Sequence, residues 1–451
     1  MSDARPPLSP CPTAATAEAD TPIAPDTASP DERVVSLVTS LSRANLAAQF
    51  SEQMTLAVIP IVAVIALQAS AEQTASLQAA TTLPFLLLSL PAGVLADRYR
   101  RKPLMIATEL LRAVALLLLF ALFQMKWLSL TALGALGFAM ASGTVVFGAA
   151  APSLVAMLVG PAHLLAANRQ LETARSIAFT AGPAIGGVLA GVASGMFAFA
   201  AAFALSLGSA FWLSRLPEEA PRAPSHRDFK RELAQGIRFI ATNAYLRSIV
   251  ATAFVFNTSW YLLLAIFAYY AIDALAFSAQ AVGAALGVYG FGMVCGAMGY
   301  ARIAQRLSFG RQILLGPVCA AGAALLMAST SMLAVGDRHG VAHGLVFIAF
   351  FLFGFGPIVW TISTTSLRQV VTPGGLIARV SAATMTATFG ARPLGAFLGA
   401  WVASSLGIKA CLIAMALGFA LQLTIILRSP AARLRSLTSL VSVASGSNGS
   451  S

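Results

Sequence analysis

Charge is the scarcest feature of this 451-residue sequence. Asp, Glu, Lys and Arg together make up 10% of the residues, whereas hydrophobic residues make up 58%. A soluble globular protein has about 25% charged and about 45–50% apolar residues. So few charges cannot cover the surface of a soluble fold of this size. The composition therefore places most of the chain in a membrane.

The sequence also has few residues suited to metal or redox chemistry. Its four cysteines show no metal-site or redox spacing, and three of them lie in apolar runs. Among the four histidines only His339 and His343 are four residues apart, and one such pair does not define a metal site. Nucleotide-binding loops and paired Asp-rich motifs are absent from the sequence. We therefore expect no metal and no cofactor, and a membrane-embedded enzyme is only a remote alternative.

Long apolar runs dominate the rest of the sequence. The run Leu110–Phe123 has no apolar–polar alternation, which argues against a transmembrane β-barrel. At roughly 33 residues for each spanning helix with its loop, about 12 spans fit. We predict an all-α polytopic membrane protein with spans at residues 41–67, 74–96, 104–124, 128–150, 171–193, 195–214, 246–271, 281–302, 312–332, 341–366, 379–403 and 407–427.

The basic residues indicate how these spans are oriented. The net charge is +12, which in a membrane protein reflects basic cytoplasmic loops rather than nucleic-acid binding. With a cytoplasmic N-terminus, 23 of the 29 Lys and Arg residues fall inside and only Lys126, Arg338 and Lys409 outside. This distribution predicts an even number of spans with both termini in the cytoplasm.

The distribution of polar segments predicts five parts of the chain. Residues 1–32 and 429–451 are polar tails that we expect to be disordered. Residues 215–245 contain a basic amphipathic stretch, expected to form an interfacial cytoplasmic helix. This linker separates a six-helix N-terminal half, 33–214, from a six-helix C-terminal half, 246–428. Weak similarity between 168–187 and 379–396 supports such a repeat, which is typical of transporters.

A motif between the second and third predicted spans points to one family. Residues 93–102 read Gly-Val-Leu-Ala-Asp-Arg-Tyr-Arg-Arg-Lys. This segment resembles the loop motif of the major facilitator superfamily, although Arg100 replaces the second glycine of that motif. The resemblance implies two six-helix halves and a gating role for Gly93, Asp97, Arg98, Arg101 and Lys102. A generic basic loop is the alternative. We expect Gly93 to let two helices approach closely.

A second motif lies in the fifth predicted span. Gly182, Pro183, Gly186 and Gly187 resemble the antiporter motif of proton-coupled exporters, with Ala178 in place of its first glycine. Proline permits a helix bend, and glycines allow backbone contact with a neighbouring helix. A kinked packing helix without a coupling role is the alternative. Residues 152–187, 233–247 and 367–399 also resemble the bacterial branch that contains enterobactin exporters.

Polar residues inside spans are costly in a bilayer and mark functional candidates. In the first span Asn45, Gln49, Glu52 and Gln53 form one polar stripe, and we expect Asn45, Gln49 and Gln53 to line the substrate cavity. Glu52 is the acid placed nearest mid-depth. We predict that it carries the coupling proton, the alternative being a structural acid bonded between helices.

Further polar groups complete the predicted substrate cavity. They lie on the seventh, tenth and eleventh spans: Asn257, Trp260, Tyr261, Thr361, Thr364 and Arg392. Trp260 is equally well interpreted as a packing residue. Two acid–base pairs, Glu109 with Arg112 and Glu172 with Arg175, are spaced three residues apart and are expected to be structural ion pairs.

These patterns predict a secondary active transporter of the bacterial inner membrane. We expect a monomeric, proton-coupled exporter that moves a small amphipathic molecule by alternating access and binds no nucleic acid. A dedicated siderophore exporter is the alternative suggested by the enterobactin-exporter resemblance. A non-transporting sensor would need a sizeable soluble signalling domain, which the polar tails do not provide.

Overall fold

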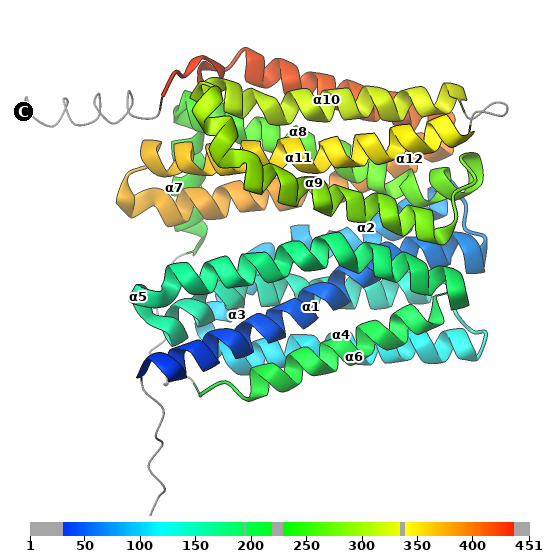
Figure 1. The fold of residues 1–451 in the computed structure, drawn as a ribbon, viewed down its shortest axis with the longest axis horizontal. Helices are drawn as coiled ribbons and strands as arrows, with labels where there is room; N and C mark the ends of the chain where they lie inside the picture. The colour runs from blue at the N-terminus through cyan, green and yellow to red at the C-terminus, as the bar shows by residue number, and fades with distance from the viewer. Residues whose placement is uncertain (1–29, 194, 219–228, 334–338, 437–451) are drawn as a thin grey trace, which may run out of the picture.

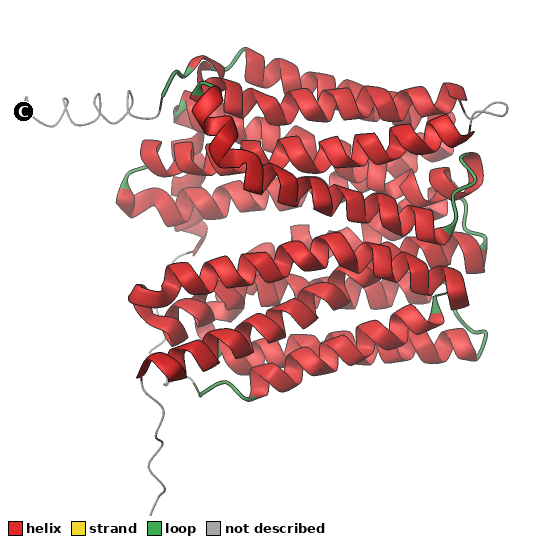
Figure 2. Ribbon diagram, viewed as in Figure 1, coloured by secondary structure: helices red, strands yellow, loops and turns green. Residues whose placement is uncertain are grey.

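The computed structural model describes residues 30–193, 195–218, 229–333 and 339–436. Every regular element in these ranges is a helix, and no strand occurs there (Figure 2). The predicted all-α membrane fold is therefore confirmed. The predicted disordered tails lie almost entirely outside the described residues, apart from the start of the first helix and the short C-terminal turn.

The helices have the following bounds. In chain order they are α1 Pro30–Leu67, α2 Ala71–Leu87, α3 Ser89–Arg98, α4 Arg101–Gln124, α5 Leu130–Ala193, α6 Met196–Ser214, α7 Phe229–Thr242, α8 Ala244–Tyr269, the π-helix η1 Tyr270–Ala274, α9 Ala279–Arg306, α10 Phe309–Leu333, α11 His339–Val371, η2 Gly374–Leu376, α12 Ile377–Leu427 and η3 Pro430–Arg433.

Ten helical segments in the described ranges are long and apolar enough to cross a membrane. Two of these belong to α5, at Leu130–Val159 and Gln170–Val192. The 49-residue segment Arg379–Leu427 is interrupted at Gly407, which has φ +81° and reverses the chain between two predicted spans. The segment formed by α2 and α3 is interrupted, and neither helix alone has the length of a membrane span, with 17 and 10 residues. The twelve predicted spans are recovered once both interruptions are considered.

The interruption between α2 and α3 was not expected, because a single span was predicted over 74–96. The backbone breaks at Leu88, whose N–H donates to Pro84 O. Pro91 follows three residues later and has no N–H to donate to Leu87 O. A helix cannot pass this position with all its hydrogen bonds intact, so the second span forms two shorter helices.

The helices form two bundles, shown in Figure 1 as the lower blue-to-green group and the upper green-to-red group. The N-terminal bundle contains α1–α6, and the C-terminal bundle contains α8–α12. The start of α1, α7 and the C-terminal end of the described chain lie at one end of the molecule (Figure 1). We call this the linker end and the opposite one the far end. The predicted linker helix is α7, which packs against α12 and α8.

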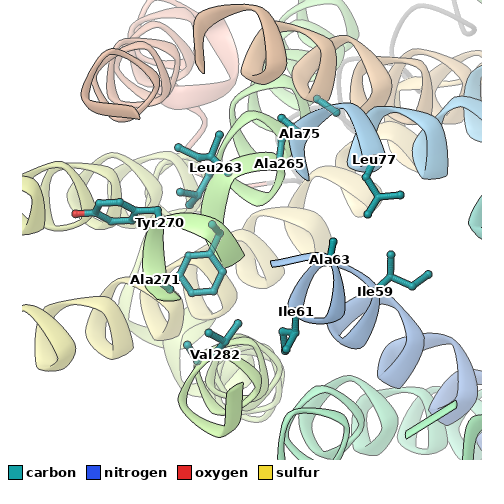
Figure 3. Packing of buried hydrophobic residues seen from close by; sticks show 14 of the residues in the cluster. Ile59, Ile61, Ala63, Ala75, Leu77, Leu263, Ala265, Tyr270, Ala271 and Val282 are labelled. Atoms are coloured by element: carbon teal, nitrogen blue, oxygen red, sulfur yellow. The ribbon is translucent and has the colours of Figure 1, made fainter. Parts of the chain in front are cut away.

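The two bundles are joined by a continuous buried core. Figure 3 shows Ala63 of α1, Leu77 of α2, Ala265 of α8 and Val282 of α9 around one region of this core. The principal helix pairs that bridge the bundles are α5 with α9 and α2 with both α12 and α8. Since lipid tails are as apolar as these side chains, close packing rather than the hydrophobic effect holds such helices together.

Candidate functional site

The central cavity lies between the two bundles and has a volume of about 1220 Å³. Both bundles supply its walls, since α1, α2 and α5 face α8, α9 and α12 across it. Among the predicted site residues, those lining it are Glu52, Gln53, Pro183, Asn257, Trp260, Tyr261 and Arg392. The fold therefore brings residues from distant parts of the sequence to one ligand-sized space.

Glu52 belongs to a buried charge cluster. Its Oε2 lies 4.0 Å from Arg112 Nη2, and its side chain is 18% exposed. Arg112 Nη1 donates to Glu109 Oε1 at 2.7 Å, and the Glu109 side chain is fully buried. Arg112 also donates to Thr144 Oγ1 at 2.7 Å and to Ala48 O at 3.3 Å. Two carboxylates thus share one guanidinium, and only Glu52 faces the central cavity.

The shared arginine was not foreseen. The spacing of Glu109 and Arg112 predicted their pairing, and the structure brings these two side chains together. The approach of Glu52 from α1 depends on how α1 packs against α4, α5 and α6, which no local pattern encodes. The polar stripe on α1 was the available signal that this helix meets other polar groups.

Arg392 faces the same cavity but is held by aromatic rings. Its guanidinium carbon lies 4.3 Å from the centroid of Phe389, 4.8 Å from Phe85 and 5.3 Å from Tyr261. Its Nε is buried without a hydrogen-bond partner, and no ion pair joins it to a carboxylate among the described residues. Arg392 and Glu52 therefore share a cavity without forming a direct ion pair.

Trp260 is mainly a packing residue. Its ring is 6% exposed, stacks on Tyr289 at 4.9 Å and contacts Phe353 at 5.0 Å. Neighbouring Asn257 donates Nδ2 to Ala253 O at 2.9 Å, and Tyr261 is half-buried. Of the two interpretations of Trp260, the geometry favours packing, with one edge of the ring reaching the cavity wall.

Two predicted cavity residues lie elsewhere. Asn45 Nδ2 donates to Leu171 O of α5 at 3.3 Å, so it joins two helices of the N-terminal bundle. Gln49, one turn further on, is half-buried and is also absent from the central cavity lining. The stripe on α1 is long enough to meet α5 at one end and the cavity at the other. The placement of these two residues in the central cavity is wrong for this conformation.

A second cavity lies within the C-terminal bundle and has a volume of about 900 Å³. The predicted residues Thr361 and Thr364 line this C-half cavity rather than the central one. Their hydroxyls donate to Pro357 O and Trp360 O, both at 2.8 Å. Phe256 and Asn257 line both cavities.

The second predicted ion pair lies on α5. Arg175 Nη2 is 2.6 Å from Glu172 Oε1, and Arg175 Nε donates to both carboxylate oxygens. The side chains are 39% and 58% exposed, so this is a partly solvated helix pair of small energetic weight. The guanidinium also lies over Phe179, which lines the central cavity.

The loop motif differs from its expected arrangement. Gly93 has no atom within 4 Å of the position of a Cβ, so it makes no close helix contact and that expectation is wrong here. Arg98 is exposed, whereas Arg101 is 6% exposed and approaches Met157 Sδ. Lys102 donates to Leu216 O. The side chain of Asp97 lies outside the described part of the structure.

The glycines of the α5 motif serve two different contacts. A Cβ at Gly182 would lie 2.8 Å from Gln53 Cβ, and one at Gly186 would lie 3.2 Å from Met54 O, both on α1. A Cβ at Gly187 would lie 2.7 Å from Gly283 Cα and Ala279 O, both on α9. Pro183 is buried beside them. The motif thus packs α5 against α1 of its own bundle through Gly182 and Gly186, and against α9 of the other bundle through Gly187.

The described residues contain no cluster of three or more His, Cys, Asp or Glu side chains suited to a metal ion. His343 Nε2 instead lies 2.7 Å from Leu275 O, and the side chain of His339 lies outside the described part. The arrangement offers charge pairs and a ligand-sized space whose mostly apolar wall carries a few polar groups, as small-molecule sites commonly do.

Two helical bundles around a central cavity that carries a few polar and charged groups have the architecture of the major facilitator type. The family model described as transmembrane secretion effector matches residues 39–445, and the chain belongs to this family. No curated protein is significantly similar to it in sequence. With its family and structural relatives all transporters, the chain is a multi-pass membrane transporter rather than an enzyme.

Solved structures share the fold at low sequence identity. A POT family transporter in complex with 5-aminolevulinic acid has a TM-score of 0.72 at 11% identity, with 89% of this chain and 99% of that chain covered. A bacterial homologue of the iron transporter ferroportin has a TM-score of 0.69 in its inward-facing state, at 14% identity and coverages of 87% and 98%. The corresponding outward-facing structure has a TM-score of 0.58, at 15% identity and the same coverages.

Proposed function

We propose that this protein is a proton-coupled exporter of a small amphipathic molecule, working as a monomer in the bacterial inner membrane. The observation that carries the proposal is the position of Glu52, which faces the central cavity while sharing Arg112 with buried Glu109. An acid in this position can exchange a proton with the cavity while its neutralising partner stays fixed. The small-molecule substrate occupies the same cavity.

The coupling follows from competition around Arg112. When Glu52 is ionised, Arg112 is balanced by two carboxylates, and one negative charge remains in the cluster. Protonation of Glu52 removes that charge and weakens its hold on Arg112. Because buried charges interact strongly, this change alters which arrangement of α1 and α4 is favoured. A protonation step can then bias the two-state movement of the bundles.

The packing of the two bundles supports the assignment of this conformation as inward-facing. The closest contact between the bundles pairs α5 with the first half of α9, near the far end. The ribbons of the two bundles diverge toward the linker end (Figure 1). If the linker end is cytoplasmic, as the basic loops predict, the cavity opens inward. The higher TM-score to the inward-facing than to the outward-facing ferroportin homologue supports the same assignment.

The decisive test is Glu52→Gln in proteoliposomes. Glutamine keeps the size of the side chain and removes its titration. We expect substrate accumulation driven by a pH gradient to be lost, while downhill exchange of substrate persists. The free energy that one proton charge supplies is about 2.3 kcal/mol per 100 mV, or roughly fifty-fold in concentration.

The matched control is Glu72→Gln, because Glu72 is an exposed acid at the start of α2, outside the cavity. This variant should accumulate substrate as the unmodified protein does. Full gradient-driven accumulation by Glu52→Gln would move the coupling site to Glu109 or Glu172.

Siderophore export is the narrower alternative within this proposal. It is favoured only by the resemblance of residues 152–187, 233–247 and 367–399 to enterobactin exporters. Measurement of siderophore release from iron-starved cells with and without the gene would decide it. Unchanged release with intact transport of another molecule would exclude this alternative.

A further inference from the structure

The C-half cavity contains polar groups that the proposed coupling does not use. Trp360 Nε1, Arg368 Nε and Gln422 Oε1 are buried and have no hydrogen-bond partner. All three residues line this one cavity. Buried polar atoms are nearly always paired in proteins, so three unpaired atoms in one space indicate that something else satisfies them.

Two of these groups are fixed on one helix. Trp360 and Arg368 are eight residues apart on α11, with Thr364 midway, so all three share a face. A Cβ at Gly316 of α10 would lie 2.5 Å from Trp360 Cβ. Because glycine has no side chain, α10 leaves room for Trp360 at this position. The donors are held by the packing of the bundle rather than by a mobile loop.

The third group comes from the opposite wall. Gln422 lies on the last span of α12 and is only 2% exposed. Its amide makes no hydrogen bond among the described residues, and an amide can turn to present either its oxygen or its NH₂ group. A fully buried amide without partners is costly to keep unless a ligand completes it.

The charge of this cavity is positive. Arg368 forms no ion pair or hydrogen bond in the described structure, and the cavity lining includes no Asp or Glu. Between residues 246 and 451 the sequence has only two acids, Asp273 and Asp337. Asp273 is exposed at the far end of α8, in η1, away from the lining.

We propose that the C-half cavity binds an amphipathic organic anion, whose oxyanion group is held by Arg368, Trp360 and Gln422. The guanidinium and the indole N–H donate to the anion, and the amide of Gln422 turns to donate its NH₂ group. The apolar part of the molecule extends past Phe256 and Asn257, which line both cavities. This inference rests on the proposed function, because it assigns the chemical class of the transported molecule.

Binding of a matched pair of probes tests the inference. We would use biphenyl-4-carboxylate and its uncharged isostere biphenyl-4-carboxamide, with purified protein in detergent and isothermal titration calorimetry. The protein should bind the carboxylate at least about tenfold more tightly than the carboxamide, as expected for charged hydrogen bonds. Equal binding of the two probes, or no binding of either, would overturn the inference.

Variants assign the preference to the site. Arg368→Gln should weaken carboxylate binding by about tenfold to a hundredfold and leave carboxamide binding unchanged. The matched control is Arg306→Gln, since Arg306 is exposed at the end of α9 and outside the cavity lining. It should bind both probes as the unmodified protein does. An Arg368→Gln protein that keeps the carboxylate preference would refute the assignment.

Two further variants keep the test usable if Arg368→Gln does not fold. Trp360→Phe removes the N–H but keeps a ring, and Gln422→Met removes the amide at similar length. Each should lower the carboxylate preference several-fold, and preference retained in both would refute the site. The binding measurement needs no proton gradient, so its failure is distinct from a failure of proton-driven transport by the same preparation.

Discussion

The contact between Gly187 and α9 gives a sharp test of how the two bundles meet. Gly187→Ala would place a Cβ 2.7 Å from Gly283 Cα and from Ala279 O. Both neighbours are backbone atoms of α9, so no side chain can rotate away. The substitution adds one methyl group, and the steric conflict that it creates lies at the contact between the two bundles. We expect it to disfavour the conformation described above.

The size of the effect follows from the geometry. Ordinary contact begins at 3.4 Å, so α9 would have to recede by about 0.7 Å from α5. Overpacking of this kind costs about 1–3 kcal/mol. Because that cost applies only where the two helices touch, it shifts the equilibrium between conformations by roughly 5–150-fold.

Distances between spin labels would measure the shift. Trp127 follows the end of α4 and Met332 lies in the last turn of α10, and these two helix ends point toward the far end (Figure 1). The two residues are 69% and 83% exposed. Labels on cysteines placed at these two positions, with the native cysteines replaced, should show a single short distance when the far end is closed. In Gly187→Ala the longer-distance population should increase.

Two glycine variants serve as controls. Gly208→Ala has no atom within 4 Å of the new Cβ, and Gly186→Ala contacts only α1 of its own bundle. Gly208→Ala should leave the distances unchanged and should not lower the melting temperature, because alanine favours a helix over glycine. Gly186→Ala should lower the melting temperature without increasing the longer-distance population. An unchanged distance distribution in Gly187→Ala would refute the proposed role of this contact.

Three other predictions follow from the described contacts. Glu109→Gln leaves Arg112 with a weakened partner and should lower the free energy of unfolding by up to about 3–5 kcal/mol, measured by thermal unfolding. Trp260→Ala removes a stacked, buried ring and should cost about 3–5 kcal/mol, whereas Trp260→Phe should cost much less. Gly236→Ala would place a Cβ against Arg379 O and should detach α7 from α12, seen as faster proteolysis within α7 at unchanged melting temperature.

Much of the architecture was predictable because apolar run length and the location of basic residues are local properties of the sequence. The exception arises where backbone chemistry acts within a run. Pro91 splits the second span, since it lacks an N–H. The turn at Gly407, by contrast, lies where the sequence predicted the boundary between the spans 379–403 and 407–427.

The site was predictable to a smaller extent. A buried polar group needs a wet or paired environment, and on this ground the sequence indicated Glu52, Asn257 and Arg392 as cavity residues. The structure places these three residues in the lining of the central cavity. The same reasoning placed Asn45 in the cavity, although a backbone carbonyl of α5 satisfies it equally well. Thr361 and Thr364 were predicted to line the substrate cavity, but they line the C-half cavity instead of the central one. Only tertiary packing decides which of the two cavities a side chain faces.

The sharing of Arg112 has an electrical consequence. Glu109 and Arg112 together form a neutral dipole, so the variable charge near the central cavity is that of Glu52, set against the fixed charge of Arg392. With Glu52 ionised these two cavity charges cancel, and with Glu52 protonated the cavity carries one positive charge. A bound organic anion is balanced by Arg368 of the C-half cavity and therefore does not remove this charge. The membrane potential then acts more strongly on the carrier with protonated Glu52 than on the carrier with ionised Glu52, by about 2.3 kcal/mol per 100 mV for a charge that crosses the whole field.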